Sequence, residues 1–228
     1  MGETVGPAAI VSTVLDEVFE RITVLRHELA LMFAAAAEDP LTRKDLVRLE
    51  PRVLAELSNR ESIRCGMGVI MTPGVLMDAT MWIEWWVRDS RGDVRNADFD
   101  FNENSLDFYD YTVAEWFMAP RRGVERSLVG PYVDFNGVDD YIVTATSPLL
   151  VGDQCVAVVG SDLRVDTLER RLYGLNGVED VLVANTSDRV IVSTSPEFLP
   201  GSVFRQPAAA QWEQQPLKNY PWRVAIRR

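Results

Sequence analysis

The chain has 228 residues, a length that suits one large domain or one domain with a helical extension. Its 34 acidic and 23 basic residues give a formal charge of −11, and the basic residues are scattered, so we expect no nucleic-acid partner. Hydrophobic residues make up 47% of the chain, which is enough for a sizeable core that needs neither disulfides nor a metal.

The sequence favours a cytoplasmic location. Cys65 and Cys155 lie far apart in apolar, strand-like stretches, which indicates two buried thiols in a reducing compartment. Asp16, Glu17 and Glu20 interrupt the first apolar stretch, so it does not have the pattern of a signal peptide. No uninterrupted apolar run approaches the ~20 residues that span a bilayer, and we expect no membrane partner.

The first predicted element is a long amphipathic helix. Its apolar residues recur at spacings of 4, 3, 4, 3, 4, 3 and 4, at Val11, Leu15, Val18, Ile22, Leu25, Leu29, Met32 and Ala36. Such a heptad seam either packs against the helix's own domain or also meets a second copy of itself, which would make a homodimer. The pattern is compatible with both arrangements.

A second helical stretch is predicted to begin at Thr42 and to end near Arg60. Asp45 stands three residues after Thr42, as in a capping box, and Pro51 interrupts the stretch. The single histidine, His27, falls off the apolar seam of the first helix, so we expect it to be solvated.

After Arg64 the pattern changes to strands. We expect strands at 65–73, 81–89, 130–135, 141–152, 154–163 and 221–228, a short helix at 165–174, a hairpin at 178–196 and a polar, acidic loop at 90–108. Strands in succession with few helices between them predict an α+β fold with a mixed, mostly antiparallel sheet. We therefore divide the chain into a helical segment, 1–63, and a sheet domain, 64–228.

No motif in the chain indicates catalysis, a cofactor or a metal. Four side chains from Asp98 to Asn104 alternate like the first ligands of an EF-hand loop, but Glu103 stands where glycine is required, and Tyr109 where glutamate belongs. No nucleophile is accompanied by a recognisable base. We expect a protein that is not an enzyme and that needs no cofactor.

The stretch "YDYTVAEWF", residues 109–117, is rich in aromatic side chains. As a helix, it would place Tyr109, Val113 and Trp116 on one face, with Phe117 adjacent. We expect Val113 and Phe117 to pack as core. Tyr and Trp bury an apolar body and keep one polar group that needs a partner, so Tyr109 and Trp116 are candidates for a pocket wall.

Acidic residues further along the chain are candidates for the same pocket. Tyr132 and Asp134 share one face of a predicted strand, because residues two apart point the same way. Asp162 ends the apolar strand that includes "AVVGSD", where a lone buried carboxylate is costly. Asp162 either belongs to the pocket or caps the helix that follows.

These stretches resemble the Cache domains, the PAS-like ligand sensors of bacterial receptors. The order of "YDYTVAEWFMAP", "GPYVD", "YIVTATSPLL" and "VAVVGSDL" carries the resemblance, which covers about residues 65–165 well and the rest by topology. The resemblance implies a long N-terminal helix, a PAS-like sheet and a pocket on one face of that sheet. In the amino-acid-binding members, aromatic and aspartate side chains line the pocket.

The resemblance implies a set of ligand-binding residues in this chain, namely Tyr109, Trp116, Phe117, Tyr132, Asp134 and Asp162. Ala114 stands where those members have an arginine that grips the ligand's carboxylate. Arg121 or Arg122 could replace that arginine, so binding of an amino acid or of a small carboxylate stays open.

The sequence therefore predicts a small-molecule sensor domain for a compact amine-bearing or amino-acid-like ligand. Such a sensor would report to a signalling protein of unknown identity or to a second subunit. The alternatives are a structural or protein-interaction module with a degenerate pocket and, further off, an enzyme that uses the carboxylates.

Overall fold

The computed structural model describes residues 6–36, 40–133, 141–175, 177–205 and 208–228. Its helices are α1 (Pro7–Ala35), α2 (Arg43–Leu46), α3 (Glu50–Leu57), α4 (Glu115–Arg121) and α5 (Val165–Leu172), with 3₁₀ turns η1 (Val47–Leu49), η2 (Tyr111–Val113) and η3 (Ala208–Gln211). Its strands are β1 (Arg64–Met71), β2 (Ile83–Arg88), β3 (Val94–Asn96), β4 (Ser127–Val133), β5 (Tyr141–Val151), β6 (Gln154–Arg164), β7 (Asp180–Ala184), β8 (Val190–Ser193), β9 (Glu213–Pro216) and β10 (Arg223–Arg227).

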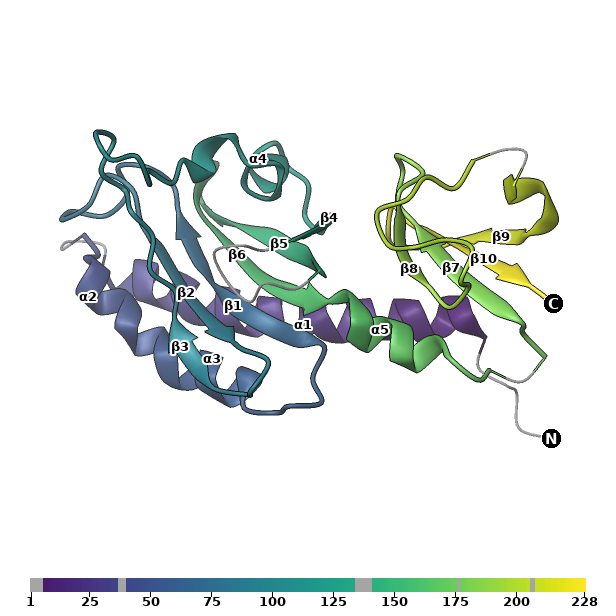
Figure 1. Ribbon diagram of the computed structural model, residues 1–228. Coiled ribbons are helices and arrows are strands. Elements are labelled where there is room, and N and C mark those ends of the chain that lie inside the picture. The colour runs from purple at the N-terminus through teal and green to yellow at the C-terminus, as the bar shows by residue number, and fades with distance from the viewer. Residues whose placement is uncertain (1–5, 37–39, 134–140, 176, 206–207) are drawn as a thin grey trace.

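The strands form two sheets that share one long helix. The first sheet has six strands in the order β3-β2-β1-β6-β5-β4, and the second has four in the order β8-β7-β10-β9. Helix α1 runs along one side of both sheets, and α5 connects them (Figure 1). The predicted α+β class, with an N-terminal helix before antiparallel strands, is confirmed. The domain boundary between 63 and 64 stays a prediction.

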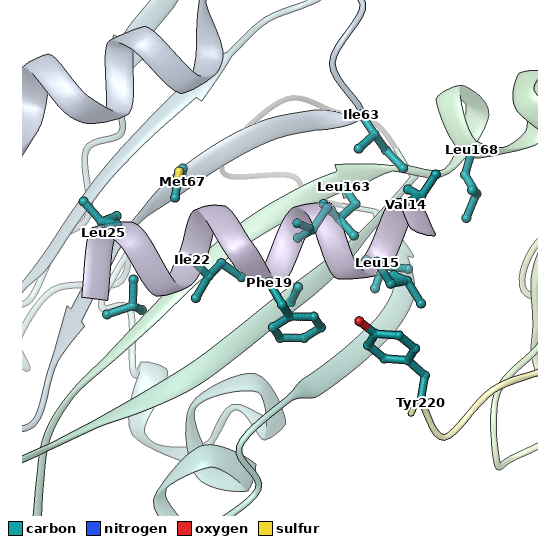
Figure 2. Packing of buried hydrophobic residues seen from close by; sticks show 14 of the residues in the cluster. Val14, Leu15, Phe19, Ile22, Leu25, Ile63, Met67, Leu163, Leu168 and Tyr220 are labelled. Atoms are coloured by element: carbon teal, nitrogen blue, oxygen red, sulfur yellow. The ribbon is translucent and has the colours of Figure 1, made fainter. Parts of the chain in front are cut away.

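The apolar seam of α1 packs within its own chain. The seam from Val11 to Leu29 is fully buried, in one cluster that continues through β1, β5, β6, α5 and the second sheet. Figure 2 shows Leu15 and Phe19 of this helix facing Tyr220, which comes from the far end of the chain. The seam is therefore occupied, and the predicted homodimer has no support from it. His27 is exposed, as expected.

The second helical stretch agrees with the sequence. The hydroxyl and the backbone N–H of Thr42 both donate to the Asp45 carboxylate, at 2.7 and 3.0 Å, in the predicted capping box. Pro51 lies in the first turn of α3, where a missing N–H costs nothing because those donors have no partner within the helix.

Two sequence expectations need correction. The stretch 109–117 is not one helix, because Ala114 is extended and separates η2 from α4. Val113 is consequently 77% exposed instead of packing as core. The expected loop at 90–108 contains β3, and β9 was not predicted. The sequence of β9, Glu-Gln-Gln-Pro, is polar and exposed and shows no alternation of apolar and polar residues, so it gave no strand signal.

Alternation along the strands gives the first sheet two different faces. In β1, Met67, Val69 and Met71 point toward α1, while Gly66, Gly68 and Ile70 face the opposite side. The other strands of this sheet alternate in the same way, and α4 covers part of the face opposite α1 (Figure 1). That second face carries the candidate site. Within the described residues, no helix is long and apolar enough to cross a membrane.

Candidate functional site

A cavity lies between the first sheet, α4 and the loop that follows β3. It contains about 520 Å³ of space unoccupied by atoms, including its open mouth. Its walls are mainly apolar and aromatic, and the residues that line it are Ile70, Ile83, Trp85, Val87, Ala97, Phe99, Tyr109, Trp116, Tyr132, Ile142, Thr144 and Asp162. This mainly apolar and aromatic lining, with a few polar groups, is typical of sites for small molecules.

The Trp85 ring packs directly against glycines of neighbouring strands. Gly68 of β1 and Gly160 of β6 are paired across the sheet. A Cβ atom added at Gly68 would stand 2.9 Å from the Trp85 ring, and one at Gly160 would stand 3.4 Å from it. The absent side chains therefore let the indole lie close to the sheet and turn its N–H toward Asp162.

Asp162 is the charged side chain among the described residues that line the cavity. It is 6% exposed, and two neutral groups hold its carboxylate. The indole nitrogen of Trp85 donates to Oδ2 at 3.1 Å, and the Thr144 hydroxyl donates to Oδ1 at 2.6 Å. The hydroxyl of Tyr132 in turn bonds to that of Thr144. This chain of hydrogen bonds orients a carboxylate in an apolar, low-dielectric pocket.

Gly66 leaves the space that Asp162 occupies. The two residues are partners in the ladder between β1 and β6. A Cβ atom at Gly66 would stand 2.6 Å from Asp162 Oδ2 and 2.9 Å from the Trp85 indole nitrogen. Any larger residue at position 66 would displace the carboxylate or the indole.

The loop after β3 supplies one aromatic wall. Phe99 stacks on Tyr109, with ring centroids 5.0 Å apart. The backbone carbonyl of Asp100 accepts from the Tyr109 N–H at 2.8 Å, which joins the two ends of this loop. The Asp100 carboxylate accepts from the Asn102 N–H at 2.8 Å, so this acid stabilises a turn. Hydrogen bonds from Ser105 and Asn102 hold the pKa of Asp100 below its usual value.

Helix α4 supplies the opposite wall through Trp116. The Thr146 hydroxyl of β5 donates to the Trp116 carbonyl at 2.8 Å and ties the helix to the sheet. Tyr111 lies beneath the helix, fully buried, and donates to the Met71 carbonyl at 2.8 Å. Burial raises the pKa of Tyr111 to about 12, so it stays a neutral tyrosine that supports the wall.

The structure brings four predicted site residues together and leaves two others out. Tyr109, Trp116, Tyr132 and Asp162 line the cavity. Asp162 lies within β6, and Arg164 is the residue at the start of α5, so the capping alternative is wrong. Asp134, one of residues 134–140, lies outside the described residues and stays a prediction.

Phe117 and Arg121 do not line the cavity. Phe117 is fully buried and packs edge-on against Tyr111, at 5.0 Å between ring centroids. Arg121 lies over the Phe117 ring at 5.2 Å. Arg122 instead donates to Glu115, at 2.5 Å, on the exposed side of α4.

The sequence prediction missed Trp85, Thr144 and Phe99. Ile83, Trp85 and Val87 alternate along β2, and this period placed all three on one face of the sheet. The sequence did not show which face would remain uncovered. Thr144 and Phe99 gave no signal of their own, because a strand threonine and a loop phenylalanine are both common.

Neither of two sequence comparisons identifies a relative: no protein-family model matches the chain, and no curated protein matches it. Solved structures do resemble it. A methyl-accepting chemotaxis protein X has a TM-score of 0.67 at 14% identity, with 97% of this chain and 95% of that chain covered. The fold is that of a Cache sensor domain.

Two further neighbours of this Cache fold are amino acid chemoreceptors of Pseudomonas aeruginosa. The ligand-binding domain of PctC, solved with GABA, has a TM-score of 0.59 at 17% identity and is covered to 96%, with 97% of this chain. That of PctB, solved with L-Arg, has a TM-score of 0.58 at 16% identity and is covered to 87%, with 93% of this chain. These identities establish similarity of fold.

Proposed function

We propose that this chain is a small-molecule sensor domain that binds a compact amine-bearing or amino-acid-like ligand in the cavity of the first sheet. The observation that carries the proposal is the buried carboxylate of Asp162, held by Trp85 and Thr144 inside aromatic walls. A carboxylate in such a pocket favours a cationic ligand, because the attraction is stronger in a low dielectric.

Trp85 and Thr144 hold the carboxylate in place, because each donates a hydrogen bond to one of its oxygens. An ammonium group carries three donors, and a carboxylate group can accept several hydrogen bonds. An ammonium ligand would pair with Asp162 through charge-assisted hydrogen bonds. The predicted second carboxylate, Asp134, would share the same cation.

The aromatic walls favour the same kind of ligand. Trp116, Tyr109 and Phe99 present rings to the cavity. A cation over such a ring gains ~0.5–2 kcal/mol. The ligand must be compact, since the cavity volume of about 520 Å³ includes its mouth.

An amino-acid ligand would also need a group for its carboxylate. PctC and PctB were solved with GABA and L-Arg, which both carry an amine and a carboxylate. In this chain the Arg121 guanidinium lies over the Phe117 ring, and Arg122 forms an ion pair with Glu115. The positions of these arginines favour an amine over a small carboxylate as the principal ligand.

A thermal-shift screen of amines, amino acids and small carboxylates tests the proposal. We expect amines to raise the unfolding temperature of the wild type and of the control Asp153→Asn, which changes an exposed acid in the turn between β5 and β6. The same compounds should not stabilise Asp162→Asn. If no compound stabilises the wild type, the alternative of an interaction module with a degenerate pocket is favoured. If the stabilisation survives in Asp162→Asn, the site is wrong.

The remaining predictions about context accompany this proposal. We propose a cytoplasmic, non-enzymatic sensor, and the absence of a disulfide at Cys65 and Cys155 supports the compartment. A signalling protein or a second subunit would read the bound state. Any dimer must use a surface other than the buried seam of α1.

A further inference from the structure

A second cleft lies on the opposite side of the molecule's first sheet from the aromatic cavity, where three segments meet. Helix α1, the turn between α3 and β1, and helix α5 all contribute to it. Its lining is polar and consists of Glu17, Asn59, Arg60, Glu61, Ser62, Ile63, Arg64, Thr167, Arg170 and Arg171. This cleft plays no part in the amine site.

The cleft concentrates positive charge in an acidic protein. Four arginines face two glutamates there, although the whole chain carries a charge of −11. Arg170 pairs with Asp166 at 2.8 Å. Arg60 and Arg171 are exposed and form no ion pair with any residue that the structure describes. Two arginines of this lining are therefore not neutralised by a described acidic residue, and the guanidinium of Arg60 lies beside Gly92 in the turn between β2 and β3.

Two arginines, Arg64 and Arg88, lie beneath the cleft or at its edge. Arg64 donates to Glu56 at 3.1 Å, but its buried Nε has no hydrogen-bond partner in the described part of the chain. Arg88 is 1% exposed and donates to the backbone carbonyls of Ser62 and Arg64, at 2.7 and 2.6 Å. Burial lowers the pKa of both Arg64 and Arg88; Glu56 opposes this shift at Arg64, and Arg164 adds to it at Arg88. Several arginines therefore lie close together in this region, with Glu56 beside Arg64.

We propose that the cleft binds a small polyvalent oxyanion, one that carries phosphate groups or clustered carboxylates. Guanidinium groups bind such oxygens through paired, charge-assisted hydrogen bonds. Asp166 and Glu56 pair with Arg170 and Arg64, so a ligand with several negative charges would act mainly on Arg60 and Arg171.

Binding at this cleft would connect separate parts of the fold. Arg60 belongs to the turn before β1, whereas Arg171 belongs to α5, which joins the two sheets. An anion that contacts both would fasten this connecting helix to the first sheet. The inference is independent of the amine site, because the two cavities share no lining residue.

Calorimetric titration with pyrophosphate and with citrate, at constant ionic strength, tests this inference on the full chain. We expect the wild type to bind at least one of them. The double variant Arg60→Ala/Arg171→Ala should bind it at least about tenfold more weakly, since a hydrogen bond to a charged group is lost at each position. Both side chains are exposed, so the fold should be retained.

A charge-matched control is Lys44→Ala/Lys218→Ala, which also removes two exposed positive charges. This variant should keep the wild-type affinity. The inference is overturned if neither anion binds the wild type, or if the control loses as much affinity as the arginine variant. It is also overturned if sodium chloride at the same ionic strength gives the same heat, because the binding would then be unspecific screening.

Discussion

The two sheets of this protein use aromatic side chains in opposite ways. On the second sheet, the connection between β8 and β9 supplies Phe198, Phe204 and Trp212, which form a closed triad with ring centroids 5.3 to 6.0 Å apart. In the first sheet, Tyr109 and Trp116 stand on opposite walls of a cavity. Aromatic content therefore does not distinguish a core from a pocket.

The charged groups beside the rings make the distinction. Arg227 lies over the Trp212 ring at 5.0 Å, and Arg223 lies over Phe204 at 5.9 Å. The protein thus places its own cations on the aromatic triad of the second sheet. In the first sheet the cavity holds the carboxylate of Asp162. In the proposed function, a cationic ligand would take in this cavity the place that the arginines take on the triad.

The largest expected effect concerns the closed triad. Phe204 is fully buried, so Phe204→Ala should lower the free energy of unfolding by about 3–5 kcal/mol. Chemical denaturation measures this loss. Amine binding at the first sheet should be unchanged under conditions where the variant is folded. A variant that lost amine binding while folded would contradict the separation of the two clusters.

The next effect concerns Tyr111, the core residue beneath the pocket wall. Tyr111→Phe removes the bonds to the Met71 carbonyl and from the Trp82 N–H, and should cost about 1–3 kcal/mol at pH 8. The folded pKa, about 12, lies above the ordinary value of 10, so this stabilisation is complete below pH 10 and is lost as the pH rises to about 12.

Denaturation at pH 8 and at increasing alkaline pH should therefore show the wild type losing its advantage over Tyr111→Phe. A difference between the two proteins that stayed constant from pH 8 to pH 12 would show that Tyr111 ionises normally in the fold.

A smaller effect is expected at the pocket wall. Trp116 is half-buried, so Trp116→Ala should weaken amine binding about tenfold through loss of a ring face. It should cost less stability than Phe204→Ala does. Calorimetric titration and denaturation of the same preparation give both numbers. Unchanged affinity would place Trp116 with the core and not with the site.

The smallest effect is expected for Arg121. Its guanidinium lies over Phe117 on an exposed helix, so Arg121→Ala should change stability by ~0.5–1 kcal/mol and leave amine affinity unaltered. Titration with an amine and with its α-amino acid checks this. A selective loss of amino-acid affinity would revive the alternative in which Arg121 binds a carboxylate.

Local rules predicted much of the fold. The capping box at Thr42 and the seam of α1 follow from spacing and side-chain chemistry. The break at Ala114 could not be predicted, because nothing in "YDYTVAEWF" disfavours a continuous helix strongly. Position 114 is extended, and Val113 consequently points to solvent.

The sequence predicted the aromatic walls of the cavity but missed Trp85, which lies on the sheet. Tyr109 and Trp116 were recognisable as aromatic residues with polar groups. Trp85 depends on two glycines of other strands, Gly68 and Gly160. That contact joins residues far apart in sequence, and only the register of the sheet brings them together.

The account depends most on the charge of Asp162, and one calorimetric comparison tests it directly. An amine that stabilises the wild type is titrated beside its uncharged isostere into the wild type and into Asp162→Asn. We predict that the substitution weakens the amine at least about tenfold and leaves the isostere's affinity nearly unchanged. Equal weakening of both compounds would contradict the account, because Asp162 would then shape the pocket without pairing with a cation.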